Sequence, residues 1–187
     1  ERLRPKSLDQ YIGQQQIVGP DGPLKLAIRA GALPSIIFWG PPGVGKTTLA
    51  QILAEELKKP IFILSAISSG VKDVREVIEK ASRKDLLSQA KPILFIDEIH
   101  RFSKSQQDSL LGAVERGVIT LIGATTENPS FEVIPALLSR CQVYVLEAFG
   151  VEQLDQMLER AFEKDEWLQS QNVEVTEKKL LYQLSGG

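Results

Sequence analysis

The chain has 187 residues, and its 22 basic and 24 acidic residues give a formal net charge of −2. With 43% hydrophobic and 25% charged residues, the composition is that of a folded domain and excludes a disordered or fibrous chain. One cysteine and one histidine exclude a disulfide framework and a zinc finger. No apolar run approaches the ~18 residues of a membrane-spanning helix. We therefore expect a soluble intracellular protein with no membrane partner.

Short apolar runs predict the strands of a sheet. They are continuous rather than alternating, a pattern typical of strands buried on both faces, and they span residues 36–39, 61–64, 93–96, 119–122 and 143–145. Between these runs, apolar residues recur at helical spacing, so strands and helices alternate. Such alternation predicts right-handed crossovers and a parallel sheet flanked by helices, and therefore an α/β fold.

The pattern changes near Gly150, after which only helical spacing is visible. We expect an α/β nucleotide-binding domain over residues 1–148 and the start of a helical lid over residues 149–187. No Met precedes Glu1, and the second helical pattern continues to the end of the chain. This indicates a fragment of a longer protein.

A glycine-rich segment, residues 40–47, carries the first chemical signal. It fits the P-loop pattern G-x-x-x-x-G-K-[ST] between a predicted strand and a predicted helix. Its backbone N–H groups and the helix N-terminus suit phosphate oxygens, Lys46 is expected to reach the β- and γ-phosphates, and Thr47 to hold Mg²⁺. The alternative is an accidental match in a Gly/Pro-rich loop. The predicted nucleotide-binding residues here are Pro41, Gly43, Val44, Gly45, Lys46, Thr47 and Thr48.

Two acidic residues, Asp97 and Glu98, directly follow the apolar run 93–96. They are therefore expected at the carboxyl end of a strand, where open α/β sheets bind ligands. Asp97 is predicted to hold Mg²⁺ together with Thr47, and Glu98 to orient and deprotonate a water molecule. Alternatively, the two acids only cap the following helix.

Hydroxyl groups end a third strand, at Thr125 and Thr126. Thr126, or alternatively Asn128, is expected to hydrogen-bond the γ-phosphate or the attacking water. The alternative is a simple turn at Asn128-Pro129 that ends the strand. His100 is a candidate for substrate contact, and the lack of a second His or Cys nearby argues against a metal role. Cys141 is interpreted as a small buried apolar residue.

These motifs, in this order, resemble the AAA+ ATPases, and among them the clamp-loader clade. Residues 3–14 are similar to the N-terminal box that wraps the adenine in that clade. The resemblance therefore implies nucleotide contacts from Arg4, Tyr11 and Ile12.

A second part of the resemblance lies at residues 139–141, which match the clade's Ser-Arg-Cys motif. Taken alone, Arg140 is interpreted as a solvated surface charge. The resemblance implies instead that Arg140 reaches the ATP of a neighbouring subunit as a trans arginine finger, and so implies a homo-oligomer.

Residues 123–131 and 136–141 look most like the RarA/MgsA proteins, bacterial relatives of the Werner-helicase-interacting ATPase. The resemblance implies an Mg-ATP-hydrolysing ATPase that acts on DNA, single-stranded or forked, in replication-fork maintenance and recombination. It also implies a cytoplasmic, nucleoid-associated bacterial protein, with replication or repair proteins as partners.

The alternatives within the clade are a clamp-loader subunit and a Holliday-junction branch-migration motor, whose acid pair is also followed by Ile-His-Arg. That motor carries a β-hairpin insertion before its third strand and lacks the Ser-Arg-Cys motif, whereas this chain has only the link 115–118 there. Alternatives from other classes are a small-molecule P-loop kinase and a nucleotide-gated binding module. Glu98 argues against a kinase, because a kinase must exclude water rather than activate it.

Four cations are candidate DNA contacts: Lys72, Arg75, Arg101 and Lys104. A ring of subunits would pool them into a basic channel, and the alternative is a solvated surface. The sensor-2 arginine and the C-terminal oligomerisation region of the family would lie beyond Gly187. We therefore expect this chain alone to bind nucleotide weakly and to hydrolyse it poorly.

Overall fold

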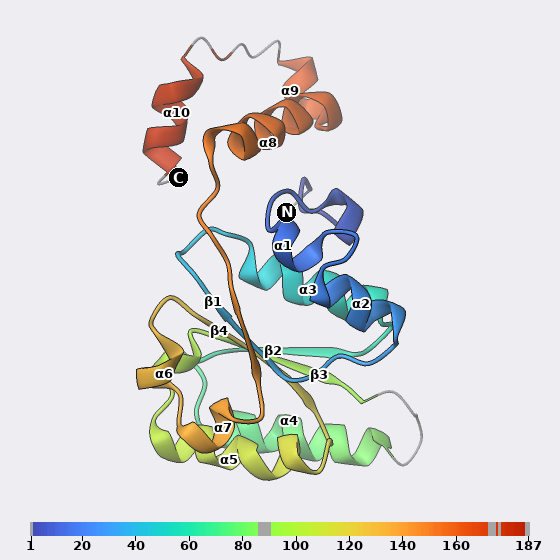
Figure 1. Cartoon of the computed structure of the whole chain (residues 1–187), viewed down its shortest axis with the longest axis vertical. Helices are drawn as coiled ribbons and strands as arrows, with labels where there is room; N and C mark the ends of the chain where they lie inside the picture. Colours follow the sequence, from blue (N-terminus) through green and yellow to red (C-terminus); the bar gives the residue numbers. More distant parts are fainter. Residues whose placement is uncertain (1, 86–90, 172–174, 176, 186–187) are drawn as a thin grey trace.

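The computed structural model describes residues 2–85, 91–171, 175 and 177–185. Figure 1 shows a twisted sheet between helices, with further helices following it in the chain. In chain order the elements are η1 (Leu8–Gln10), α1 (Gln15–Val18), α2 (Pro23–Arg29), β1 (Ile36–Trp39), α3 (Lys46–Glu56), β2 (Ile61–Ser65), α4 (Val71–Asp85), β3 (Ile93–Asp97), η2 (Ile99–Arg101), α5 (Lys104–Glu115), β4 (Thr120–Thr125), α6 (Pro129–Glu132), α7 (Pro135–Leu138), β5 (Gln142–Val145), α8 (Val151–Lys164), α9 (Glu166–Ser170) and α10 (Lys178–Ser185).

The five strands form one sheet in the order β2-β3-β4-β1-β5. Every pairing is parallel, and Ile36 at the start of β1 is opposite Ile122 of β4 and Gln142 of β5. All five carboxyl ends therefore meet at one edge of the sheet, which positions the loops after β1, β3 and β4 near one another. The predicted α/β fold with a parallel sheet is confirmed.

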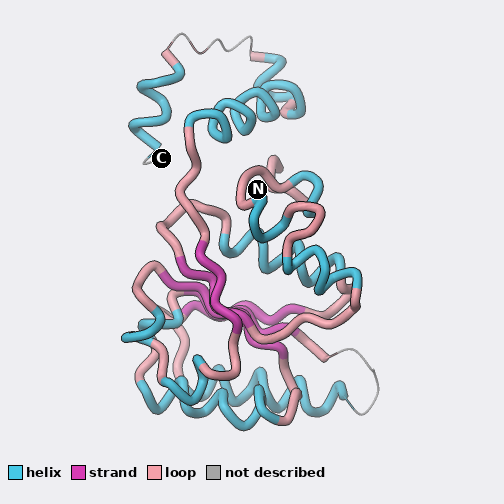
Figure 2. The backbone as a smooth tube through the Cα atoms, in the orientation of Figure 1, coloured by secondary structure: helices cyan, strands magenta, loops and turns pink. Residues whose placement is uncertain are grey.

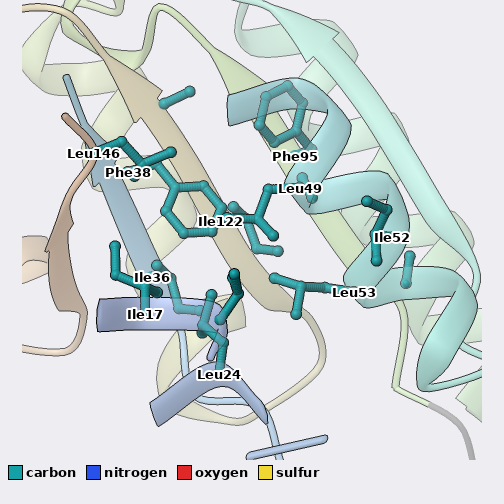
Figure 3. Packing of buried hydrophobic residues seen from close by; sticks show 14 of the residues in the cluster. Ile17, Leu24, Ile36, Phe38, Leu49, Ile52, Leu53, Phe95, Ile122 and Leu146 are labelled. Atoms are coloured by element: carbon teal, nitrogen blue, oxygen red, sulfur yellow. The ribbon is translucent and has the colours of Figure 1, made fainter. Parts of the chain in front are cut away.

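Two apolar clusters, one on each face, hold the helices against the sheet. Phe38 and Phe95 pack with Leu24 of α2 and with Leu49 of α3, as Figure 3 shows. On the other face, α4, α5 and α7 pack against the sheet through fully buried side chains such as that of Leu110. Burying one such side chain stabilises the fold by about 1.5–3 kcal/mol. These clusters fix the strand ends that carry the polar residues.

The prediction that all strands are buried on both faces is wrong for β2 and β5. Ile63 of β2 is 49% exposed, and Val143 and Val145 of β5 are 40% and 51% exposed. Both strands lie at the edges of the sheet, where a strand has a neighbour on one side only. A continuous apolar run therefore predicts the strand but not whether helices cover it.

Beyond β5 the chain is helical in the residues that the structure describes, and Figure 2 shows these helices beyond the carboxyl ends of the strands. Arg2 forms an ion pair with Asp165 at 3.2 Å, which ties the N-terminal segment to this helical part. The division at residues 148 and 149 stays a prediction, and Gly186-Gly187 lie outside the described residues. No helix among the described residues is long and apolar enough to cross a membrane.

Candidate active site

The P-loop connects β1 to α3 and has the backbone shape that its sequence predicts. Gly43 and Gly45 have φ angles of +82° and +88°, which side chains with a Cβ rarely allow. A Cβ at Gly45 would also lie 2.6 Å from the Tyr11 hydroxyl, so two independent constraints require glycine there. The loop ends at the N-terminus of α3, where free N–H groups and the helix dipole favour an anion.

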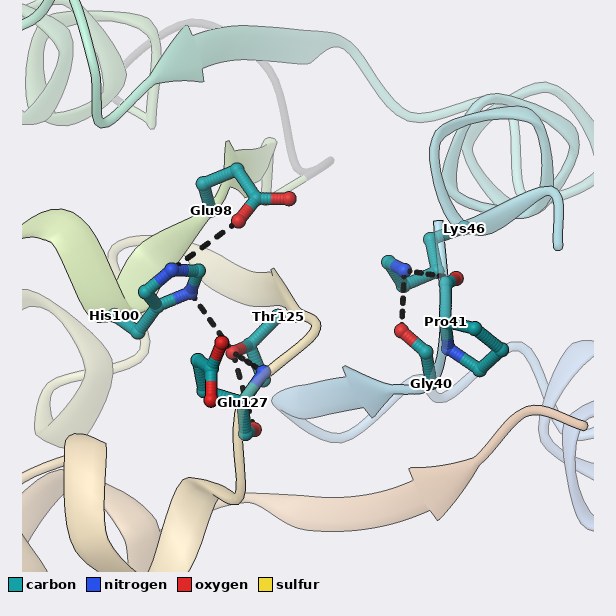
Figure 4. Close-up of polar contacts among 7 residues, drawn as sticks. All are labelled: Gly40, Pro41, Lys46, Glu98, His100, Thr125 and Glu127. Carbon is teal, nitrogen blue, oxygen red and sulfur yellow. Dashed lines mark hydrogen bonds and ion pairs between the residues drawn. The ribbon is translucent and has the colours of Figure 1, made fainter. Parts of the chain in front are cut away.

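Lys46 is buried at the base of this loop, with 7% of its surface exposed. Its Nζ donates to the backbone oxygens of Gly40 at 2.7 Å and Pro41 at 2.8 Å (Figure 4). Burial lowers the pKa of Lys46, and the negative charges of Glu98 and Asp97 oppose that shift. The ammonium group and the two carboxylates therefore share one electrostatic environment.

The acid pair lies at the carboxyl end of β3, as predicted. Asp97 is the last residue of β3 and is opposite Ser65, and Glu98 follows with a left-handed φ of +54°. The side chain of Glu98 makes no capping hydrogen bond to η2, and the next helix, α5, is capped by Ser103. Capping alone therefore does not explain this pair of acids.

The tip of β4 lies beside the acid pair and is connected to it by His100. Thr125 is fully buried, and Thr126 is half-buried immediately after the strand. His100 contacts Glu98 and Thr125, not open solvent, a link that no sequence pattern predicted. The side chain of Asn128 accepts from the N–H of Ser130 and so caps α6. This leaves Thr126 as the better candidate for phosphate contact.

A pocket of about 350 Å³ opens beside the P-loop, within the usual size range of small-molecule sites. The predicted binding residues that line it are Arg4, Tyr11, Ile12, Gly43, Gly45 and Thr48. Tyr11 donates its hydroxyl to the backbone oxygen of Val44 at 2.9 Å, and burial raises the pKa of Tyr11. The N-terminal segment thus contacts the P-loop directly and forms one wall of the pocket.

The other wall comes from the helical part, which was expected to cover the nucleotide but in which no individual site residue was predicted. It is lined by Phe149 and by Met157, Arg160 and Ala161 of α8. Arg160 donates to the backbone oxygen and side-chain oxygen of Gln10, so α8 is fastened to the N-terminal segment. Apolar periodicity predicts α8 itself, but it gives no signal that Met157 and Arg160 face a ligand pocket.

The oxygen donors suit a magnesium ion. Mg²⁺ keeps several waters and is held by one or two carboxylates together with substrate phosphates. The half-buried Thr47 and Asp97 supply one hydroxyl and one carboxylate at the carboxyl edge. Among the described residues, no group of three or more His, Cys, Asp or Glu side chains forms a dedicated metal cage. This donor set fits a metal that arrives with a phosphate ligand.

Arg140 is not brought together with the other predicted site residues. It lies between α7 and β5, at the amino end of a strand parallel to β1, whereas the P-loop follows the carboxyl end of β1. Its guanidinium pairs with Glu115 at 2.6 Å and donates to the backbone oxygen of Ala136 at 2.5 Å. A role in a neighbour's site stays a prediction.

Two smaller predictions concern Cys141 and the candidate DNA contacts. Cys141 packs against the apolar cluster on the α5 face, and burial raises the pKa of its thiol to about 12. The four cations are exposed on α4, on α5 and on the turn before α5, near the helix ends that follow β2 and β3; they are Lys72, Arg75, Arg101 and Lys104. Contact of these cations with DNA stays a prediction.

Comparison with other proteins supports the family resemblance that the sequence motifs indicate. The chain is 51% identical over 162 residues to Replication-associated recombination protein A of Haemophilus influenzae and 52% identical to that of Escherichia coli K12. It is 53% identical over 163 residues to ATPase WRNIP1 of Dictyostelium discoideum. Each match covers 87% of this chain but 36% of the two bacterial proteins and 18% of WRNIP1. The resemblance to the RarA/MgsA and Werner-helicase-interacting proteins is confirmed, and the chain spans about a third or less of these relatives.

A solved structure with the same fold is the Thermotoga maritima RuvB Holliday junction branch migration motor. It has a TM-score of 0.71 and 35% sequence identity over 87% of this chain and 55% of that chain. A solved point mutant of the same RuvB protein has a TM-score of 0.72. Because a model of the ATPase family associated with various cellular activities (AAA) matches residues 36–147, the chain belongs to the AAA family.

Proposed function

We propose that the protein is an Mg-ATP-hydrolysing ATPase that acts on DNA in replication-associated recombination. The observation that carries this proposal is the meeting of Lys46, Asp97 and Glu98 beside the P-loop at one edge of the sheet. This arrangement combines a phosphate-binding loop, a cation and two carboxylates within one environment. Those are the groups that nucleotide hydrolysis needs.

The P-loop residues divide the work of holding the triphosphate. The backbone N–H groups around Gly43 and Gly45 and the N-terminus of α3 bind phosphate oxygens. Lys46 exchanges its bonds to the carbonyls of Gly40 and Pro41 for bonds to the β- and γ-phosphates. The adenine binds in the pocket between the N-terminal segment and α8.

The acids and the neighbouring strand tip act on the attacking water. Thr47 and Asp97 hold Mg²⁺, which neutralises phosphate charge when it is bound. Glu98 accepts a proton from the water, and Thr126 hydrogen-bonds the γ-phosphate. Arg140 of a second copy supplies a positive charge in the transition state, so we infer a homo-oligomer.

The relatives support DNA as the partner. Two of them carry the name Replication-associated recombination protein A, and the chain is 51–52% identical to them. We infer that the full-length protein binds single-stranded or forked DNA and works with replication or repair proteins. Association with the bacterial nucleoid, weak activity of this chain alone and residues beyond Gly187 stay predictions.

A branch-migration motor is a second candidate, because RuvB has the same fold at 35% identity. The link between α5 and β4 favours the recombination-associated ATPase over that motor. The helix ends at Glu115 and the strand begins at Thr120, so no hairpin insertion lies between them.

Exchange of Glu98 for glutamine in the full-length protein tests the proposed chemistry. Because the amide cannot accept the proton, we expect Glu98→Gln to lower kcat about 10²–10⁴-fold while ATP still binds. The measurement is phosphate release with and without single-stranded, gapped or forked DNA. Glu132→Gln, the same change at an exposed position of α6, is the matched control.

The same assay separates the other classes of function. Phosphate transfer that requires a small-molecule acceptor would indicate a kinase. DNA-dependent function that survives in Glu98→Gln without hydrolysis would indicate a nucleotide-gated binding module. Unchanged turnover in Glu98→Gln would contradict the proposed ATPase mechanism.

A further inference from the structure

His100 lies between the acid at the end of β3 and the hydroxyl at the end of β4. Its Nε2 is 3.3 Å from Oε2 of Glu98, and its Nδ1 is 3.0 Å from Oγ1 of Thr125 (Figure 4). The two ring nitrogens therefore contact two different strand ends. One of the two contacted residues, Glu98, is the proposed general base.

The hydrogen bonds of Thr125 make this bridge directional. Besides His100, Oγ1 of Thr125 accepts from the N–H of Glu127 at 3.0 Å and lies 3.2 Å from its carbonyl oxygen. A hydroxyl carries one proton, so Thr125 donates either to His100 or to the carbonyl of Glu127. With Nε2–H donating to the Glu98 carboxylate, a neutral His100 must accept from Thr125. The turn after β4 thus competes with His100 for that proton.

The bridge has little room for other arrangements. Thr125 is fully buried, and only 8% of the His100 side chain is exposed. Hydrogen bonds are stronger in such an environment, and an unpaired partner is costly. Glu98 is held in a left-handed backbone conformation directly before η2, which carries His100. If the tip of β4 shifts, His100 must therefore move with it, or the hydrogen bond between His100 and Thr125 breaks.

We propose that His100 is a positioning residue that makes the orientation of Glu98 depend on the tip of β4. Thr126, the proposed γ-phosphate contact, is the next residue after Thr125. A movement of Thr126 onto the phosphate therefore moves the Thr125 hydroxyl, and His100 transmits that movement to the Glu98 carboxylate. The inference rests on the proposed hydrolysis function and adds how its general base is aligned.

Double-mutant analysis in the full-length protein tests this role. We expect His100→Ala and Thr125→Val each to lower kcat about 10–100-fold, since a small misplacement of a reacting group has effects of this size. The ATP dissociation constant should change less than about twofold. The double variant should be about as slow as the slower single variant, because both substitutions break the same bridge. Thr125→Ser keeps the hydroxyl and should return kcat to within about threefold of the wild type.

Controls separate positioning from a merely structural role. A structural lesion would lower the thermal midpoint and ATP affinity together with kcat. Thr125→Ser would then show the same losses, because it also removes the buried methyl group. Ser130→Ala, an exposed change on α6, should leave every value unchanged. If His100→Ala does not fold, the comparison of Thr125→Val with Thr125→Ser still decides the question.

The outcomes distinguish this inference from the proposed function. Multiplicative losses in the double variant, or wild-type kcat in His100→Ala while Glu98→Gln is inactive, would overturn the bridge alone. Full turnover in Glu98→Gln would overturn the proposed function. A substrate contact by His100 would be revealed by a weakened ATP dissociation constant without loss of kcat, and that result would also overturn the positioning role.

Discussion

The two edges of the sheet differ in what they hold. At the carboxyl edge, Lys46, Asp97 and Glu98 come together, because a parallel sheet gathers the ends of all its strands on one side. At the amino edge, Arg140 is paired with Glu115, with β5 between it and the edge that carries the P-loop. One copy thus brings together the P-loop and the acid pair, whereas Arg140 lies at the opposite edge. Under the proposed function, a complete hydrolytic site is therefore built from opposite edges of two copies.

A large loss of activity is expected when the cation of the amino edge is removed. Arg140→Ala should lower kcat by about 10³-fold or more, as for arginine fingers in related nucleotide hydrolases. Mixing Arg140→Ala with Glu98→Gln should restore part of the activity, because some interfaces then combine a wild-type Glu98 with a wild-type Arg140. Phosphate release by the mixture is the measurement.

A matched control for this experiment is Arg116→Ala, an exposed arginine at the end of α5. It should retain normal activity. If mixing restores no activity, or if specific activity stays constant down to dilute monomer, the result contradicts the proposal that Arg140 of one copy completes the site of another copy.

A smaller effect is expected from the exposed cations near the carboxyl edge. The double charge reversal Lys72→Glu and Arg101→Glu should weaken DNA binding and reduce the slope of log K against log salt by about one per lost phosphate contact. Binding measured across a salt series checks this. The controls are Lys80→Glu, which lies on α4 as Lys72 does, and Arg116→Glu at the far end of α5. Equal losses in reversal and control variants would indicate that net charge, not this edge, governs DNA affinity.

The weakest effect concerns the contact between the N-terminal segment and the P-loop. Tyr11→Phe removes the hydroxyl that donates to Val44 and leaves a buried carbonyl unpaired. We expect the binding free energy of ATP to weaken by about 1 kcal/mol, which is a loss of roughly fivefold in ATP affinity measured by titration. Tyr144→Phe removes a hydroxyl that bonds to Gln142 on β5 and should leave affinity unchanged. Equal affinities of the two variants would show that the Tyr11 bond does not shape the loop.

Much of the carboxyl edge could be predicted from sequence because local rules determine it. The P-loop pattern sets backbone shape over consecutive residues, and an acid after an apolar run is placed at a strand end by the chain itself. Arg160 and Met157 could not be predicted to line the pocket, because their position depends on how α8 packs on a distant segment. The exposure of Val145 likewise depends on strand order, which no local pattern encodes. His100 is a candidate from sequence, but its partner Thr125 is distant along the chain.

The ion pair between Arg140 and Glu115 has a consequence for association. Both side chains are substantially solvated, with 39% and 48% of their surface exposed. Such a pair contributes at most about 1 kcal/mol. The carboxylate of Glu115 therefore neutralises the guanidinium of Arg140 in a single copy while contributing little to stability. Under the proposed role of Arg140 in a neighbour's site, this pre-existing bond therefore opposes the docking of a second copy only weakly.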